Sequence, residues 1–135
     1  MTPPAREIFS SLLPCPLTLI LKKKSPVPNI LTGGSDNLGI RWSDYSLVQR
    51  LLDEYGFPLT ATSANLAGAS PLYSVSSLTE KFEDVSLSLI DLVIDAGPLP
   101  QRSPSTVLDL TSDQYKILRP GVISEAKIKA VLRFK

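Results

Sequence analysis

A run of small and polar residues, ATSANLAG at 61–68, is the part of this chain best suited to hold a polar ligand. Ser63 and Asn65 place a hydroxyl and an amide two positions apart, and the alanines beside them leave room for another molecule to approach the backbone. A simple Ser/Asn-rich turn is the alternative, and for an isolated run it is the more common one. The other polar segments of the chain therefore decide what this run predicts.

Polar residues also follow other strand-like segments. Arg41 and Arg119 carry planar guanidinium groups suited to a carboxylate or a phosphate, and Ser105 and Thr106 add two hydroxyls. Each has a plainer interpretation, because a lone arginine is often a surface ion-pair partner and a Ser-Thr pair can simply begin a strand. In open sheets, ligands bind where such loops meet at the strand ends. The residues thus predict a small-molecule site without identifying the ligand.

The chain has no histidine and only one cysteine, which limits the kinds of catalytic and metal site that it can form. A Ser-His-Asp triad, a histidine-paired thiol, an internal disulfide and a Cys/His zinc site are all excluded. Asp95 and Asp109 lie near strand ends and could bind Mg²⁺, although a single aspartate is more often a turn former. Neither standard phosphate-binding glycine loop is present. Any chemistry must therefore depend on hydroxyl, amide, guanidinium and backbone groups. These groups position ligands and do not form a nucleophile-base pair.

The composition is that of an ordinary globular domain. The chain has 135 residues, of which 43% are hydrophobic, and a net charge of +1, so global charge favours no particular partner. No apolar run approaches the roughly 20 residues that span a bilayer, and the N-terminus does not resemble a signal peptide. The lone Cys15 suits a reducing compartment. We therefore expect a cytoplasmic location.

Strand-like and helix-like patterns alternate along the chain, which predicts an α/β or mixed α+β fold. Helices are expected near both termini, after Ser43, and after Ser74 or Ser76, with Ser124 capping the last of them. The expected strands are Leu17–Lys23, Leu38–Trp42, Pro58–Thr62, Leu89–Ala96, Thr106–Leu110 and Tyr115–Leu118.

Five segments, in this order, resemble the motifs of the YrdC/Sua5 family, the L-threonylcarbamoyladenylate synthases. They are PCPLTLIL from Pro14, LGIR ending at Arg41, SANLAG from Ser63, PSTVLD from Pro104 and RPGVI from Arg119. The family patterns are PGPxTxxL, (V/I)xxR, SANxSG, (P/E)STVVD and RPGxI. The resemblance implies a twisted open sheet flanked by helices.

The resemblance also implies a reaction. L-threonine, bicarbonate and ATP would form threonylcarbamoyl-AMP and pyrophosphate, with ATP as a substrate and Mg²⁺ accompanying it on ligands that the sequence does not assign. A partner transferase would then move the threonylcarbamoyl group to an adenosine of tRNA. Catalysis of this kind depends on orientation and charge stabilisation, which require neither histidine nor cysteine.

Roles for particular residues follow from the matched motifs. The resemblance implies that Arg41, Ser63 and Ser105 hold the threonine part. It implies nucleotide contacts from Asn37, Asn65 and Arg119. It also implies that Thr18 and Thr106 shape the pocket.

Three departures from the family pattern stand out. Cys15 replaces a glycine, which adds a side chain at a tight turn, and Ala67 replaces a serine. The family's N-terminal segment, with its KxR motif for the triphosphate, has no match here. Residues 1–135 therefore resemble one partial domain, its C-terminal two-thirds. We expect weak or no synthase activity alone, and exposed strand edges that a second chain or a rearranged edge would cover.

Two other functions fit parts of the sequence. A non-catalytic module could bind nucleotide or double-stranded RNA through Lys22–Lys24, Arg41, Arg102 and Arg119. The second alternative is a protein that transfers a carbamoyl group. Domains of this type also occur in hydrogenase maturation proteins and antibiotic O-carbamoyltransferases. Those proteins, however, carry further domains.

Overall fold

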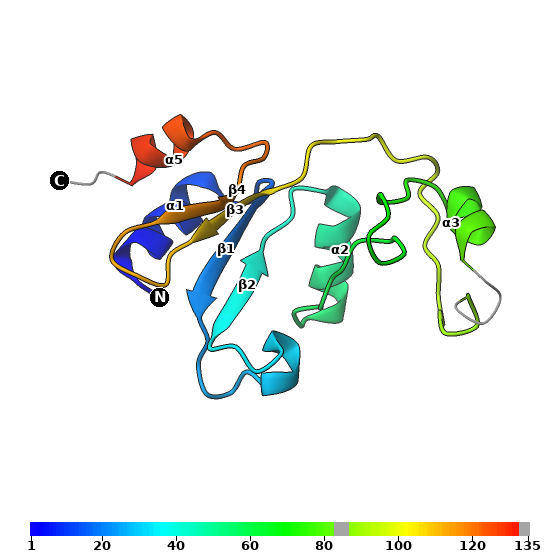
Figure 1. The fold of residues 1–135 in the computed structure, drawn as a ribbon, viewed down its shortest axis with the longest axis horizontal. Coiled ribbons are helices and arrows are strands. Elements are labelled where there is room, and N and C mark those ends of the chain that lie inside the picture. The colour runs from blue at the N-terminus through cyan, green and yellow to red at the C-terminus, as the bar shows by residue number, and fades with distance from the viewer. Residues whose placement is uncertain (83–86, 133–135) are drawn as a thin grey trace. The chain divides into compact units, whose positions relative to one another are not determined.

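The structure, a computed structural model, describes residues 1–82 and 87–132 and divides into two compact units (Figure 1). The larger unit combines Met1–Leu59 with Ser103–Lys135, and the smaller one is Thr60–Arg102. The larger unit contains the sheet, whereas the smaller unit carries the ATSANLAG run. Each unit is described by itself.

The described strands form a four-stranded mixed sheet in the order β2-β1-β3-β4. They are β1 (Leu17–Lys22), β2 (Asn37–Arg41), β3 (Thr106–Asp109) and β4 (Lys116–Arg119). The central pair, β1 and β3, is parallel, and the outer strands β2 and β4 pair antiparallel to it. The mixed α+β class predicted from the sequence is confirmed.

Two short helices share one hydrophobic core with the sheet. In α1 (Pro3–Leu12), Thr2 caps the first turn, and Ala5 and Ile8 are fully buried. Ser124 caps α5 (Glu125–Val131), as the sequence predicted, and Ile128 of that helix is also fully buried. The core cluster consists of Ala5, Ile8, Cys15, Leu17, Leu19, Leu108, Leu110, Ile123, Ile128 and Leu132. Since side chains alternate along a strand, the residues between these positions lie on the opposite, open face of the sheet.

The remaining helices are more exposed. Helix α2 (Ser46–Tyr55) ends at Gly56, whose φ of 74° is the left-handed conformation that glycine adopts without strain. The 3-10 helix η1 (Asn29–Thr32) connects β1 to β2. In the smaller unit, Ser74 caps α3 (Val75–Lys81), which confirms one of the two capping residues predicted.

The start of α2 differs from the sequence prediction. Ser43 was expected to cap this helix, but the capping position is Tyr45 and the first helical residue is Ser46. The Ser43 hydroxyl accepts a hydrogen bond from the Tyr45 backbone N–H at 3.2 Å, and the Ser43 carbonyl accepts one from Gln49 Nε2 at 2.8 Å. Ser43 therefore forms a local turn before the helix instead of capping it.

Two predicted strands are absent from the described residues. Segments 58–62 and 89–96 pair with no other strand, and Leu92 in the second of them is 76% exposed. A strand is stable only when its peptide groups bond to a neighbour, and β-branched side chains alone do not provide one. The predictions were wrong at this point because the described part of the chain offers these segments no adjacent strand.

Cys15, which stands where the family has glycine, packs into the core of the larger unit and is only 9% exposed. Burial raises the pKa of its thiol above the ordinary value, with a smaller contribution from Asp44, while Lys127 and Arg41 oppose the shift. The extra side chain is thus accommodated as a small hydrophobic group.

A pH dependence of stability follows from the raised pKa of Cys15. The neutral thiol stabilises the fold fully below the unfolded pKa of about 8.5, and this contribution disappears as the pH rises through the higher folded pKa. We expect the unfolding free energy of the wild type minus that of Cys15→Ala to be constant below about pH 8 and to shrink above it. Urea unfolding across that range measures it, and a constant difference throughout would contradict the prediction.

Candidate functional site

A chain of hydrogen bonds links Thr18 in β1, Ser105 just before β3 and Arg119 at the end of β4. Arg119 donates from Nε and Nη2 to the Ser105 carbonyl at 3.1 and 2.8 Å, and Nη2 also donates to Ser105 Oγ at 3.0 Å. The Thr18 and Ser105 hydroxyls are 3.1 Å apart. Because the guanidinium fork is planar, Arg119 fixes both the carbonyl and the hydroxyl of Ser105. Ser105 itself is only 6% exposed.

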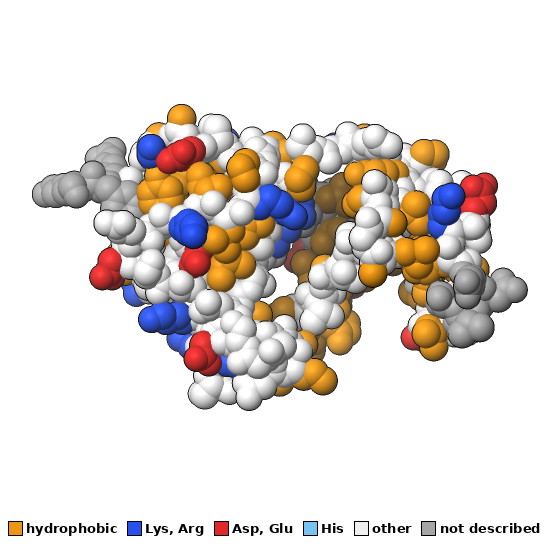
Figure 2. Space-filling model, in the orientation of Figure 1, with side chains coloured by type: hydrophobic (Ala, Val, Ile, Leu, Met, Phe, Trp, Pro, Cys, Tyr) orange, Lys and Arg blue, Asp and Glu red, His pale blue; other side chains and the backbone are white. Residues whose placement is uncertain are grey.

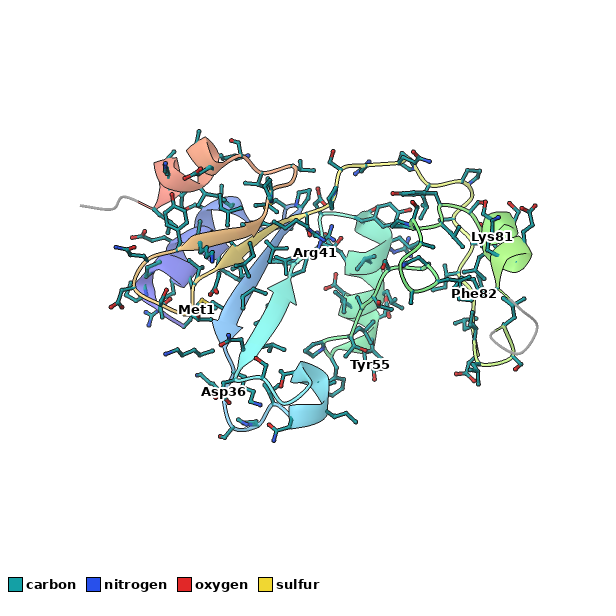
Figure 3. All side chains as sticks on the ribbon, viewed as in Figure 1. Met1, Asp36, Arg41, Tyr55, Lys81 and Phe82 are labelled. Atoms are coloured by element: carbon teal, nitrogen blue, oxygen red, sulfur yellow. The ribbon has the colours of Figure 1, made fainter. Side chains whose placement is uncertain are left out.

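The strand register extends this network across the open face. Arg41 is opposite Thr18, Thr18 is beside Val107, and Val107 is opposite Arg119. Directly paired residues point to the same face, so both arginines lie on the open face with Thr18 between them. Figure 3 shows Arg41 at the end of β2. Its side chain is exposed and has no hydrogen bond or ion pair among the described residues, so its charge is available to an anion.

Gly121 allows two of the sequence motifs to pack closely against each other, because it has no side chain. A Cβ added at Gly121 would lie 2.3 Å from the Pro104 carbonyl oxygen and 2.5 Å from the Thr106 nitrogen. The Val122 N–H also donates to the Pro104 carbonyl at 3.3 Å. The RPGVI turn therefore packs backbone against backbone on the PSTVLD segment, which explains why this position requires glycine. Gly121 lies within the RPG motif, but the motif by itself gave no reason for a glycine at this position.

Thr106 has a different environment from Thr18. It is fully buried and pairs with Leu17, on the face that contributes to the core. Its hydroxyl donates to the Ile123 carbonyl at 2.7 Å and accepts from the Ile123 N–H at 3.0 Å. This pair of bonds attaches the start of β3 to the segment before α5. Thr106 thus supports the site from the core side, whereas Thr18 belongs to the open face.

Asn37 lies at the opposite end of β2 from Arg41, where it pairs with Lys22. The two ends of the strand are about 13 Å apart at the usual rise per residue. The Asn37 backbone N–H donates to Ser35 Oγ at 3.0 Å. The structure therefore does not bring Asn37 next to the Thr18, Ser105 and Arg119 network.

In the smaller unit, the side chain of Asn65 stabilises the loop of the ATSANLAG run through two hydrogen bonds. Its Nδ2 donates to the carbonyls of Leu66 at 2.8 Å and Ala69 at 3.1 Å, and Gly68 has a φ of 79°. The Asn65 Oδ1 is buried and has no hydrogen-bond partner among the described residues. Ser63 is exposed, and its hydroxyl makes no hydrogen bond within them. One acceptor and one hydroxyl thus remain for a ligand.

Replacing Asn65 by aspartate should open this loop. The substitution would place a carboxylate oxygen against two carbonyl oxygens instead of the donating amide, a repulsive arrangement that costs about 2 kcal/mol. We expect faster proteolysis within residues 61–69 by a nonspecific protease, measured by mass spectrometry of the fragments. The matched change Asn29→Asp, in η1 of the larger unit, should leave the cleavage rate of the loop unchanged, and equal rates for wild type and Asn65→Asp would contradict the prediction.

The acidic residues suggested for Mg²⁺ have local partners. Asp95 Oδ1 accepts from the Gly97 N–H and Asp109 Oδ1 from the Thr111 N–H, each at 2.8 Å, which is the geometry of turn formers. No group of three or more acidic, histidine or cysteine side chains gathers within residues 1–82 and 87–132. In the same described ranges, no helix is long and apolar enough to cross a membrane.

Comparisons with known proteins identify the family of this chain. The Sua5/YciO/YrdC family model, whose description is "Telomere recombination", matches residues 1–121. A threonylcarbamoyl-AMP synthase from Yersinia enterocolitica is 37% identical over 117 residues, which are 86% of this chain and 59% of the relative. The chain therefore belongs to the YrdC/Sua5 family.

Solved structures show the same fold. The structure of Pyrococcus abyssi Sua5 complexed with L-threonine matches with a TM-score of 0.85 and 31% identity, covering 98% of this chain and 38% of that one. Escherichia coli YciO matches with a TM-score of 0.79 and 28% identity, covering 95% of this chain and 61% of that one. The chain thus spans less than two-thirds of the length of each of these relatives.

Proposed function

We propose that this chain supplies the threonine-binding and nucleotide-binding part of a threonylcarbamoyl-AMP synthase. The proposal is supported by the family membership, by the synthase names of the relatives and by the L-threonine in the Pyrococcus abyssi structure. The product would serve a separate transferase that modifies tRNA.

The observation that carries the proposal is the row of paired residues across the open face of the sheet, which consists of Arg41, Thr18, Val107 and Arg119. We call it the open-face row. Arg41 offers a free guanidinium on the strand next to Thr18, Arg119 donates to the Ser105 hydroxyl, and the Ser105 hydroxyl is hydrogen-bonded to that of Thr18. An amino acid with a hydroxyl side chain needs this combination, a cation for its carboxylate and neutral hydrogen-bonding groups for its polar edge. In this proposal Ser63 adds a threonine contact, and Asn37, Asn65 and Arg119 contact the nucleotide.

The reaction sets a charge requirement. The threonine nitrogen forms a bond to the carbon of bicarbonate with loss of water, and the resulting carbamate oxygen attacks the α-phosphorus of ATP while pyrophosphate leaves. Carboxylate, carbamate and triphosphate are all anions, so transition-state stabilisation requires several fixed cations. Within the larger unit, the open-face row supplies Arg41 and Arg119, whereas Lys22–Lys24 lie at the other end of β1. We therefore infer weak or no turnover by this chain alone.

Mg²⁺ would accompany ATP in this function. The described residues offer it no cluster of carboxylates, and Asp95 and Asp109 serve local turns. No part of the proposed binding depends on a protein-bound metal ion, and the metal would stay with the triphosphate.

Calorimetry with the whole 135-residue chain tests the binding assignment. We expect L-threonine to bind and L-valine, which has the same shape without the hydroxyl, to bind more weakly; equal affinities or no threonine binding would overturn the assignment. Release of pyrophosphate from ATP tests turnover separately. Rapid release of pyrophosphate that depends on both threonine and bicarbonate would overturn the inference of weak activity. It would leave the binding assignment intact.

The RNA-binding alternative gains no support from the described geometry. Arg41 and Lys22–Lys24 lie at opposite ends of the β1–β2 pair, and Arg119 directs three hydrogen bonds to Ser105. These residues do not form a continuous basic strip within the larger unit.

A further inference from the structure

Strand β2 is one edge of the described sheet, and alternate peptide groups along it face away from β1 (Figure 1). The Lys23 N–H donates to the Asp36 carbonyl at 2.8 Å, and these two residues continue the β1–β2 register. Hydrogen-bonded and non-hydrogen-bonded pairs alternate in an antiparallel ladder, so Leu38 and Ile40 bond to β1. The peptide groups of Gly39, which lies between them, therefore point outward, where another strand can pair with them.

The outward peptide groups of β2 are accessible. By the same alternation, Asn37 and Arg41 at the two ends of the strand also face outward, and both are exposed, as is Gly39. The Asn37 N–H donates to Ser35 Oγ at 3.0 Å, whereas the outward groups of Gly39 and Arg41 have no such bond within the described residues. The middle of this edge is thus ready to accept a strand.

The other edge of the described sheet, β4, is less suited to pairing. The β3–β4 register shifts between Val107 and Leu108, and Lys116 and Arg119 place a cation at each end of β4. Irregular register and charged side chains are features that protect an edge strand from pairing. In contrast, the β1–β2 register is regular, and the only charged residue of β2 is Arg41. We therefore take β2 as the edge that is open to a partner.

We propose that two copies of this chain associate through their β2 strands, which pair antiparallel about a two-fold axis at Gly39. In this register Gly39 is opposite Gly39 of the partner. Leu38 is opposite the partner's Ile40, and Asn37 is opposite the partner's Arg41. The outward peptide groups of both strands then form roughly six hydrogen bonds, and the two sheets join into one.

The apolar residues of β2 fit a second copy. Leu38 and Ile40 pair with Leu21 and Leu19 of β1, so their side chains lie on the same face of the sheet. Both line a mostly apolar cavity of about 400 Å³, and Ile40 is 38% exposed. Figure 2 shows that other hydrophobic side chains also lie at the surface, among scattered charges. Because each Leu38 meets the partner's Ile40, the pairing covers apolar surface on both copies.

The polar residues of β2 fit the same arrangement. Arg41 is opposite the partner's Asn37, whose amide oxygen accepts hydrogen bonds from a guanidinium. An axis at Arg41 would instead place two guanidinium groups directly opposite each other, which is destabilising. Read in reverse, the sequence of β2 thus supplies an apolar residue opposite each apolar residue and an acceptor opposite Arg41. This match is the reason for inferring a second copy as the partner.

The dimer also extends the open-face row. Asn37 and Arg41 lie on the open face, because they pair with Lys22 and Thr18 at alternate positions of β1. Within one chain they are at opposite ends of β2. Across the two-fold axis they are directly opposite, with their Cα atoms about 5.5 Å apart. Each copy therefore places an amide beside the Arg41 of its partner.

Analytical ultracentrifugation of the whole 135-residue chain measures the association. A five-residue strand from each copy is a small interface, so we expect a Kd on the order of 10 µM. A chain that stays monomeric at a concentration on the order of 1 mM would overturn the proposal.

Hydrogen exchange locates the interface. The Gly39 and Arg41 amides should become protected as the protein concentration rises. The Leu38 and Ile40 amides, which bond to β1, should be protected at every concentration. A dimer that leaves the Gly39 and Arg41 amides unprotected would contradict pairing through β2.

Two substitutions at Gly39 form a matched pair. Gly39→Pro removes the outward N–H and leaves the bonds between β1 and β2 in place, since proline is tolerated on an edge strand. We expect it to weaken dimerisation roughly thirtyfold. Gly39→Ala keeps the N–H and should dimerise like the wild type. Circular dichroism shows whether each variant is folded, and equal dimerisation by a folded Gly39→Pro chain would overturn the proposal.

A cross-link tests the register without depending on the proline variant. Gly39→Cys, in a Cys15→Ala background, should form a disulfide-linked dimer with oxidised glutathione, because the two Cα atoms at the axis lie within disulfide range. Ile30→Cys in the same background, at an 88% exposed position of η1, is the matched control and should cross-link far less. Equal cross-linking of the two variants would exclude an axis at Gly39. These readouts involve neither threonine nor ATP, so their failure would leave the proposed function untouched.

Discussion

Replacement of Gly121 by alanine is expected to destabilise the fold by about 3 kcal/mol. The added Cβ would lie 2.3 Å from the Pro104 carbonyl oxygen, 2.5 Å from the Thr106 nitrogen and 2.6 Å from the Ser105 carbonyl carbon. All three are backbone atoms of one segment, so no side-chain rotation can relieve the overlap. The turn must move away from the segment, and urea unfolding measures the loss.

The same substitution should also disturb the site. Arg119 is two residues before Gly121 and donates three hydrogen bonds to Ser105. A shift of the turn therefore lengthens these bonds and releases the Ser105 hydroxyl from Thr18, so threonine affinity should fall together with stability. A threonine affinity equal to that of the wild type in a destabilised Gly121→Ala protein would show that the network does not position the ligand.

Gly39→Ala is the matched control. Gly39 also lies in the sheet, but a Cβ there would be 3.4 Å from the end of the Ile20 side chain and 3.8 Å from Thr18 Cγ2. These are contacts that a flexible side chain can accommodate. We expect a change within about 0.5 kcal/mol, since alanine also loses less conformational entropy than glycine on folding. A large loss at Gly39 would mean that any added methyl group in this sheet is destabilising, and it would remove the explanation given for Gly121.

Arg41→Ala is expected to abolish most of the threonine affinity without unfolding the protein. Arg41 is exposed and has no partner among the described residues, so its removal should change stability by less than about 0.5 kcal/mol. The proposed carboxylate contact is charge-assisted, and its loss should weaken binding about a hundredfold. Calorimetric titration with L-threonine measures this effect, and Arg41→Lys should recover only part of it because lysine lacks the planar fork.

Arg50→Ala provides the comparison for net charge. Arg50 lies on α2, is also exposed, and has no role in the open-face row. Its removal changes the net charge by the same amount, so it should leave threonine affinity nearly unchanged. Equal losses for Arg41→Ala and Arg50→Ala would point to a general charge effect instead of a specific contact.

Local signals predicted much of the fold correctly. The segment predicted as a strand, Leu17–Lys23, contains β1, and of the predicted helix starts Ser124 and one of the two alternatives, Ser74, are confirmed, because caps and strand patterns depend on a few neighbouring residues. Segments 58–62 and 89–96 were also predicted to be strands, but they have no partner strand within the described residues. Strand pairing is a non-local property, and residue type alone cannot supply the neighbour.

The sequence by itself determined the family, through the order of five short motifs, and the kinds of group available for chemistry. Only the tertiary structure showed that Gly121 packs against the Pro104–Thr106 backbone, that Arg119 holds Ser105, and that Thr106 faces the core while Thr18 lies on the open face. Alternation predicts that adjacent residues point to opposite faces. Which face becomes the core depends on where α1 and α5 pack, and which motifs meet depends on strand order, so both are decided by contacts between residues far apart in the chain.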